Sequence, residues 1–205
     1  MARDTQSIVK MSRREGYALH PKAHKVLVKR TSPPGQQQGR NQRYKPSQYA
    51  LQLREKQKVK RLYGLLERQF ARLMDEAGRR PGESGSILLE FLERRLDNII
   101  YRAGLAPSRR SARQLVSHGH FMLNGRRVDI PSIRLAVGDA VSLRPKSQTT
   151  DYFKRLDDTS PAPPTTPGWL KVNRSKRQIT VSGLPAREDA EPDIKEQLIV
   201  EYYSR

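Results

Sequence analysis

The sequence predicts an α+β protein with a mainly helical N-terminal domain and an inserted small module of two helices and β-hairpins. Three observations lead to this fold class. Amphipathic helical periodicity runs through residues 47–78 and returns from Ser86 to Gly104. A second, basic helix starts after Ser108. Behind it, Asn124-Gly125 between two apolar stretches is a strong short-range signal for a β-hairpin.

The first helix of the module is predicted as one continuous element that ends at Gly104. One apolar stripe repeats at three- and four-residue intervals: Leu88, Leu89, Leu92, Leu96, Ile99, Ile100 and Ala103. Glu93, Arg94, Asp97 and Arg102 lie off this stripe. Gly104 is free to take a positive φ and is therefore expected to terminate the helix.

The second helix is predicted to present cations to an anion. At about 100° per residue, one arc of about 140° holds five polar residues, Arg109, Arg110, Arg113, Gln114 and Ser117. The opposite side holds Ala112, Leu115 and Val116 and is expected to pack on a core. Guanidinium groups near a helix N-terminus, where the helix dipole already favours negative charge, predict a phosphate site.

The basic helix and the predicted hairpin after it carry almost only positive charge. Six arginines lie between Arg109 and Arg134 against a single acid, Asp129. The predicted hairpin brings Arg126 and Arg127 close to the basic helix. A solvated helix face is the common alternative for any one arginine, but the concentration of arginines favours a ligand.

The composition of the chain predicts how it divides into domains. Residues 1–46 contain four prolines and little periodicity, and are expected to form a basic extended arm that orders against a partner. A helical domain is predicted for residues 47–91, completed by the C-terminal segment 183–205. The module then spans residues 92–182 and contains a proline-rich linker at 149–167.

The overall composition restricts the function classes. A formal net charge of +19 and an isoelectric point near 10.6 predict a polyanionic partner. An anionic membrane is the competing choice, but the sequence lacks a run of about 18 apolar residues and a lipidation signal. The chain has no cysteine, which excludes disulfides and thiol chemistry. A cytoplasmic location is expected because no apolar signal segment is present, and an organelle matrix or stroma is the alternative.

No metal site or other cofactor is predicted. His20 and His24 have the spacing of two ligands on one helix face, but Pro21 intervenes and no other ligand type is nearby.

The module resembles the small RNA-binding module named after the fourth protein of the small ribosomal subunit, an alpha-L RNA-binding motif. The residues that carry this resemblance are Leu92-Glu93, Arg95-Leu96-Asp97-Asn98, Ser108-Arg109, Ala112-Arg113-Gln114-Leu115-Val116 and Asn124-Gly125. The flanks resemble the bacterial and organellar small-subunit ribosomal protein number four, in a form without zinc-binding cysteines. Their motifs include Gln52-Leu53-Arg54-Glu55, Tyr63-Gly64, Glu67-Arg68-Gln69-Phe70 and the closing residues 196–205.

This resemblance implies a structural protein that binds a helix junction in the 5′ domain of 16S rRNA and nucleates assembly of the small subunit. It also implies a place beside ribosomal protein number five, near the channel where mRNA enters, and an influence on decoding accuracy. A homo-oligomer is not expected. The residues expected to contact rRNA are Arg54, Lys56, Lys58, Lys60, Arg61, Arg109, Arg110, Arg113, Gln114, His118, Arg126 and Arg127. Those expected to face mRNA are Arg40, Arg43 and Lys45.

Two other classes of RNA-binding protein contain similar modules. A pseudouridine synthase would need a separate catalytic domain, and only about 60 residues remain once the arm, helices and module are assigned. The sequence therefore predicts that the chain is not an enzyme. An RNA-binding stress protein would bind free or stalled large-subunit RNA, and it leaves the long N-terminal domain unexplained.

Overall fold

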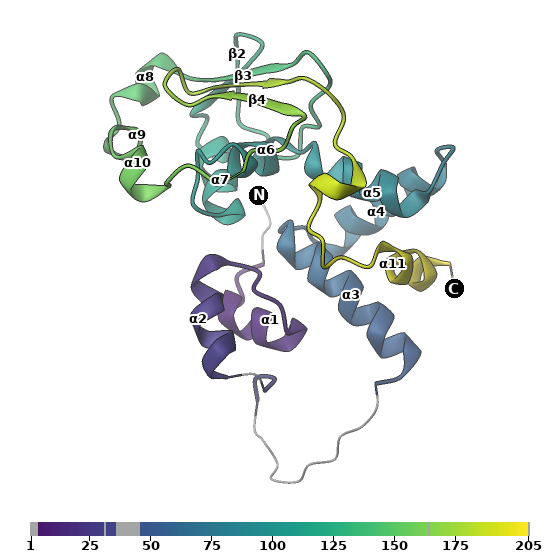
Figure 1. The fold of residues 1–205 in the computed structure, drawn as a ribbon. Coiled ribbons are helices and arrows are strands. Elements are labelled where there is room, and N and C mark those ends of the chain that lie inside the picture. The colour runs from purple at the N-terminus through teal and green to yellow at the C-terminus, as the bar shows by residue number, and fades with distance from the viewer. Residues whose placement is uncertain (1–3, 31, 36–45, 164, 205) are drawn as a thin grey trace. The chain divides into compact units, whose positions relative to one another are not determined.

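A computed structural model describes residues 4–30, 32–35, 46–163 and 165–204. The chain divides into two units (Figure 1). The first unit consists of residues 1–88 and 193–205, and the second of residues 89–192. The first unit thus includes the segment expected to be a separate arm, and residues 183–192 belong to the second unit.

The N-terminal segment is helical where an extended arm was expected. Helix α1 spans Ile8–Glu15 and helix α2 spans Pro21–Lys29. Gly16 ends α1 with a φ of 63°, and the His20 side chain caps α2 by accepting a hydrogen bond from the Lys22 amide. Met11, Leu19 and Ala23 are buried, so this segment contributes its own apolar contacts to the first unit.

The rest of the first unit is built from α3 (Gln48–Leu62), α4 (Glu67–Gly78), the start of α5 (Ser84–Glu93) and α11 (Glu196–Tyr203). Ser47 caps α3 through a hydrogen bond accepted from the Ala50 amide. Helix α11 packs on α3, and the rings of Tyr49 and Tyr202 lie 5.9 Å apart. The closing segment therefore lies against the helix that is about 140 residues earlier in the chain.

The single helix predicted for residues 86–104 is wrong, because the chain breaks at Arg94 and Arg95. Helix α5 ends at Glu93 and α6 runs over Leu96–Arg102. Arg95 has extended backbone angles and pairs with Arg134 in an isolated β-bridge. The Leu96 amide donates to the Ile133 carbonyl at 2.9 Å, and the Leu135 amide donates to the Arg94 carbonyl at 3.0 Å. These long-range hydrogen bonds replace the helical ones that periodicity alone predicts.

The second unit contains α7 (Arg109–Ser117) and a five-stranded antiparallel sheet with the order β2-β1-β3-β5-β4. The strands are β1 (Phe121–Leu123), β2 (Arg126–Val128), β3 (Ala140–Leu143), β4 (Leu170–Asn173) and β5 (Gln178–Val181). The predicted hairpin is present: Phe121 faces Val128, and Asn124 and Gly125 form the turn with φ angles of 49° and 80°.

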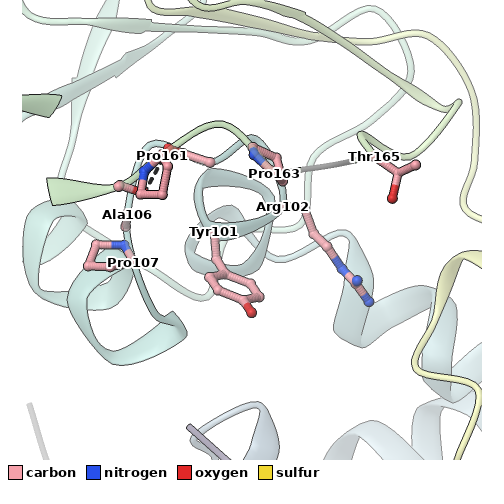
Figure 2. Close-up of a pocket in the computed structure, with 9 residues that line it drawn as sticks. Tyr101, Arg102, Ala106, Pro107, Pro161, Pro163 and Thr165 are labelled. Atoms are coloured by element: carbon pink, nitrogen blue, oxygen red, sulfur yellow. Dashed lines mark hydrogen bonds between the residues drawn. The ribbon is translucent and has the colours of Figure 1, made fainter. Parts of the chain in front are cut away.

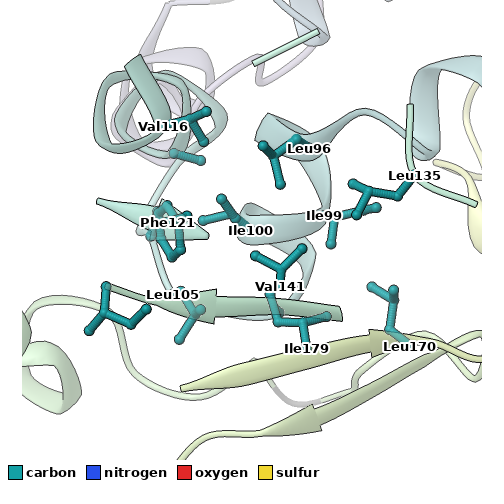
Figure 3. Packing of buried hydrophobic residues seen from close by; sticks show 14 of the residues in the cluster. Leu96, Ile99, Ile100, Leu105, Val116, Phe121, Leu135, Val141, Leu170 and Ile179 are labelled. Carbon is teal, nitrogen blue, oxygen red and sulfur yellow. The ribbon is translucent and has the colours of Figure 1, made fainter. Parts of the chain in front are cut away.

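Helices α6 and α7 cover one face of this sheet and enclose the core (Figure 3). Ile99 and Ile100 on α6 and Val116 on α7 pack toward Phe121, Val141 and Ile179 on the strands. All of these residues are buried, which gives the module a core of its own.

The predicted linker at 149–167 is partly helical. Short helices cover Pro145–Gln148 (α8), Asp151–Lys154 (α9) and Leu156–Thr159 (α10), and a 3-10 turn covers Arg187–Asp189 (η1). Phe153 and Leu156 are buried in the core cluster, so the start of this segment packs instead of spanning solvent. The proline-rich residues 160–163 and 165–167 contain no regular element.

Candidate nucleic-acid interface

Helix α7 is positioned by its cap and by its apolar side. The Ser108 side chain accepts a hydrogen bond from the Ser111 amide at 3.2 Å, which satisfies one of the unpaired donors at the helix start. Ala112 and Val116 are fully buried in the core. Arg110, Gln114 and His118 are exposed. The orientation predicted from the sequence is therefore present for these residues.

Arg109 and Arg113 have acidic partners inside the module. Arg109 Nη2 lies 2.9 Å from Glu191 Oε1, and its Nε donates to Asn98 Oδ1 at 2.9 Å. Arg113 Nη1 lies 3.4 Å from Asp97 Oδ2. Burial lowers the pKa of Arg113, and the nearby Asp97 opposes this effect. Both guanidinium groups thus hold the module together, and neither is a freely exposed charge.

A buried polar network at the start of α6 supports these contacts. The Glu93 carboxylate is 1% exposed and accepts hydrogen bonds from Arg102 Nε at 3.0 Å and Nη2 at 2.8 Å. Asn98 Nδ2 donates to the same carboxylate at 2.8 Å. Arg95 and Asp97 form a second buried pair at 3.2 Å. Glu93 was predicted to lie off the apolar stripe, and the sequence did not reveal this network. The one sequence feature that points to it is a charged residue within an apolar run.

The hairpin arginines lie next to the end of α7. A Cβ atom built on Gly119 would be 2.6 Å from Arg127 Nε, and Gly119 has a φ of 70°. Glycine adopts this left-handed conformation without strain, and a side chain at this position would also have to displace the Arg127 guanidinium group. Arg126 and Arg127 are exposed and form no ion pair with the described part of the chain.

The exposed module set is therefore Arg110, Gln114, His118, Arg126 and Arg127. Its three arginines have no carboxylate partner among the described residues. Behind His118, the His120 ring lies 3.0 Å from Ser147 Oγ and packs edge-on against Phe153. Burial, together with His118 and Arg144, lowers the pKa of His120, so this ring is neutral at neutral pH. The set is a polar, cationic surface suited to phosphate oxygens.

The cations predicted on α3 are placed differently from expectation. Lys56 is 3% exposed, its Nζ lies 2.7 Å from Glu67 Oε1, and it stacks 4.2 Å from the Tyr202 ring centre. Lys60 Nζ lies 2.8 Å from Glu67 Oε2, and Lys58 Nζ lies 2.7 Å from Glu55 Oε1. Lys56 is therefore buried and ion-paired in this structure, and its contact with RNA stays a prediction.

The two arginines of α3 both pair with Glu15 of α1. Arg61 contacts the Glu15 carboxylate directly, and Arg54 Nη1 lies 3.4 Å from Glu15 Oε1. The Glu15 side chain is fully buried, and this burial raises its pKa although Arg61 and Arg54 oppose the effect. The Arg54 side chain is 46% exposed, whereas the Arg61 side chain is only 13% exposed. Of the five residues predicted on α3, Arg54 is the one whose side chain is exposed.

The predicted mRNA contacts Arg40, Arg43 and Lys45 lie outside the described residues. Conversely, the structure exposes arginines that were not predicted as RNA contacts, among them Arg68, Arg72 and Arg79 on and just after α4. Their spacing on a helix opposite Phe70 and Met74 was the signal that could have identified them.

Comparison with known proteins gives the family. Residues 3–93 match the family described as Ribosomal protein S4/S9 N-terminal domain, and residues 94–141 match the S4 domain. Small ribosomal subunit protein uS4 of Roseiflexus sp. (strain RS-1) is 50% identical over 206 residues, which cover 100% of both chains. The chain belongs to the uS4 family. A relative of the same name from Clostridioides difficile (strain 630) is 48% identical over 212 residues and likewise covers 100% of both chains.

Membership of the uS4 family confirms several sequence-based predictions. The family resemblance stated from the motifs is correct, and the α+β fold contains an S4 domain as its RNA-binding module. The uS4 family consists of structural ribosomal proteins, so the chain is not an enzyme.

Other features of the described residues fit a uS4 protein without adding chemistry. A pocket of about 260 Å³ is lined by Tyr101, Arg102, Pro107, Pro161 and Pro163 among others (Figure 2). Among the described residues that line it there is no carboxylate or imidazole for acid-base work. In the described ranges, no group of three or more His, Cys, Asp or Glu side chains is close enough together to hold a metal ion. Each helix in these ranges is too short or too polar to span a bilayer.

Proposed function

We propose that this uS4-family chain is a structural rRNA-binding protein that contacts a helix junction in the 5′ domain of 16S rRNA and nucleates small-subunit assembly. The observation that carries this proposal is the exposed module set, in which Arg110, Arg126 and Arg127 project from rigid elements without a carboxylate partner in the described chain. The full-length similarity to uS4 proteins supports 16S rRNA as the polyanion.

Recognition by shape is the mechanism that this surface supports. The deep, narrow major groove of an RNA helix hides its base edges, so a protein reads mainly the positions of phosphates and 2′-hydroxyls. Arginines fixed on a capped helix and a tight hairpin match phosphates that a folded junction brings together. Each such contact releases counterions and contributes about 0.7 to 0.9 to the slope of log K against log salt.

Footprinting on purified 16S rRNA tests the proposal. Protection of nucleotides in the 5′ domain, lost gradually as salt rises, is the expected result. The variant Arg110→Gln, Arg126→Gln and Arg127→Gln should lower the salt slope by about 2 to 3.

A matched control removes the same charge from another exposed part of the second unit, through Lys154→Gln, Lys171→Gln and Lys176→Gln. This control should leave the footprint in place. Protection confined to 23S rRNA would favour the stress-protein alternative, and the absence of protection would contradict rRNA binding altogether.

The finer parts of the proposal follow the family resemblance. They place the protein in the small subunit of the ribosome, in the cytoplasm for a bacterial source, beside ribosomal protein number five. Arg40, Arg43 and Lys45 would face mRNA where it enters and influence decoding accuracy. Crosslinking from position 43 in assembled subunits should capture mRNA, and crosslinks to rRNA alone would contradict this assignment.

A further inference from the structure

The carboxylate of Glu191 lies against two arginines of the module, the last residue of α6 and the first residue of α7. Its Oε1 atom is 3.6 Å from Arg102 Nη2 and 2.9 Å from Arg109 Nη2. Glu191 follows the 3-10 turn η1 in a stretch without helix or strand. An acid from far along the chain therefore occupies the place where two guanidinium groups converge.

Both arginines are also held by other residues. Arg102 donates to the Glu93 carboxylate from Nε at 3.0 Å and from Nη2 at 2.8 Å. Arg109 Nε donates to Asn98 Oδ1 at 2.9 Å, and its guanidinium carbon lies 4.6 Å from the centre of the Tyr101 ring. Glu93 and Asn98 are buried, so these partners stay in place. The positions of the two guanidinium groups therefore do not depend on the acid that lies on them.

Glu191 is the partner that a ligand can replace. Its side chain is 21% exposed, whereas that of Glu93 is 1% exposed. A change of side-chain rotamer moves its carboxylate toward solvent without a change in the backbone. Tyr101 and Arg102 also line the pocket of about 260 Å³, so this corner of the module is open to an approaching group (Figure 2). Two oriented guanidinium groups then remain, an arrangement that suits the oxygens of a phosphate.

The other acids of the same segment behave differently. Glu188 is exposed and forms no hydrogen bond or ion pair with the described part of the chain. Asp189 closes its own turn, because its Oδ2 atom accepts a hydrogen bond from the Ala186 amide at 2.8 Å. The contact with the arginines is thus specific to Glu191 and is not a general property of an acidic segment.

We propose that Glu191 is an intramolecular competitor of RNA. Its carboxylate occupies the position on Arg102 and Arg109 that a backbone phosphate takes in the complex, and it has to move away before that phosphate binds. This inference rests on the proposed function, because it takes an RNA phosphate as the displacing group. RNA binding then includes the cost of breaking this ion pair, so the module binds more weakly than its arginines alone allow.

The test measures binding of the full chain to the isolated 5′ domain of 16S rRNA by filter-binding titrations at fixed salt. Glu191→Gln keeps the shape of the side chain and removes its charge, and it should tighten binding by about threefold to tenfold. The matched control, Glu188→Gln, changes the net charge equally and should tighten binding by less than about twofold. In an Arg109→Gln background, Glu191→Gln should have no larger effect than this control, because the arginine for which the acid competes is absent.

The outcomes separate this inference from the proposed function. Failure of the unmodified chain to bind the RNA would overturn the proposed function. If that chain binds and Glu191→Gln matches Glu188→Gln, the inference is overturned alone. Weaker RNA binding by Glu191→Gln, with a lower free energy of unfolding in urea, would show that Glu191 only stabilises the module and would also overturn it.

Two further results keep the test decisive. Equal tightening by Glu191→Gln with and without Arg109 would show a general effect of charge and would overturn the inference. Circular dichroism checks that each variant is folded. Should Glu191→Gln not fold, Glu191→Ala must still tighten binding more than Glu188→Gln does, and should Arg109→Gln not fold, the comparison with Glu188→Gln decides.

Discussion

Replacing Lys56 by methionine should destabilise the protein while leaving RNA binding by the folded chain unchanged. The lysine is 3% exposed and its ammonium lies 2.7 Å from Glu67 and 4.2 Å from the Tyr202 ring centre. A hydrogen bond to a charged group contributes about 1.5 to 3 kcal/mol, and a cation–π contact about 0.5 to 2 kcal/mol. Methionine keeps most of the apolar stem contacts.

The expected loss lies near the lower end of that sum. Glu67 keeps Lys60 at 2.8 Å and the Tyr203 hydroxyl at 3.0 Å, so its carboxylate is not left unpaired. We therefore expect Lys56→Met to lower the free energy of unfolding by about 2 kcal/mol. Urea unfolding followed by circular dichroism measures this, and filter-binding titrations with folded protein measure the affinity for 16S rRNA.

A matched control is Lys25→Met, because Lys25 is exposed on α2 and should change stability by less than about 0.5 kcal/mol. Arg110→Gln is the converse variant, with unchanged stability and a salt slope reduced by about 0.7 to 0.9. The reasoning is refuted if Lys56→Met lowers the salt slope as Arg110→Gln does while the unfolding midpoint stays the same.

Three more expectations concern stability. Phe121→Ala should lower the free energy of unfolding by about 3 to 5 kcal/mol in urea titrations, because this fully buried ring lies between α7 and the sheet; a loss below about 1 kcal/mol would contradict the packing. Ser108→Ala should cost about 1 kcal/mol by the same assay through loss of the α7 cap, whereas Ser108→Asp should retain it. Burial tends to raise the pKa of Glu67, but hydrogen bonds from Lys56, Lys60 and Tyr203 outweigh it and lower the value to about 2. Since this folded-state pKa is below the ordinary 4.5, the contribution of Glu67 is complete above pH 4.5 and is lost as the pH falls toward 2. The Glu67 side chain is 46% exposed, so solvent screening reduces this contribution to on the order of 1 kcal/mol. Thermal melts of Glu67→Gln should show a smaller loss of stability between pH 4.5 and 2, and an unchanged pH dependence would contradict the ion-pair assignment.

Local features of the module were predictable because their causes are local. The Ser108 cap needs only a side chain within reach of an amide three residues later, and the Asn124-Gly125 turn needs only two residues that tolerate positive φ. The exposed positions of Arg110 and Gln114 follow from helical periodicity once Ala112 and Val116 are assigned to the core. These features depend on residues close together in the chain.

The errors involve partners that are distant in the sequence. The break after Glu93 arises because the backbone at Arg94 to Asp97 bonds to residues 131–135 instead of continuing α5. Periodicity does not detect this competition, since the apolar stripe continues through the break. The extended arm was likewise mispredicted because Met11 and Ala23 gain their burial from contacts within the folded unit.

By itself the sequence determined the family, the sign and location of the charge, the capped basic helix and the hairpin, since composition, motif order and short-range hydrogen bonding are properties of neighbouring residues. Tertiary structure alone decided which cations remain available to a ligand. Glu191 meets Arg109 across 82 positions and Glu67 meets Lys56 across 11, whereas Arg110 and Arg72 meet no acid among the described residues. The sequence determines whether a side chain is charged. Whether that charge forms an ion pair depends on which carboxylate the folded backbone brings close to it.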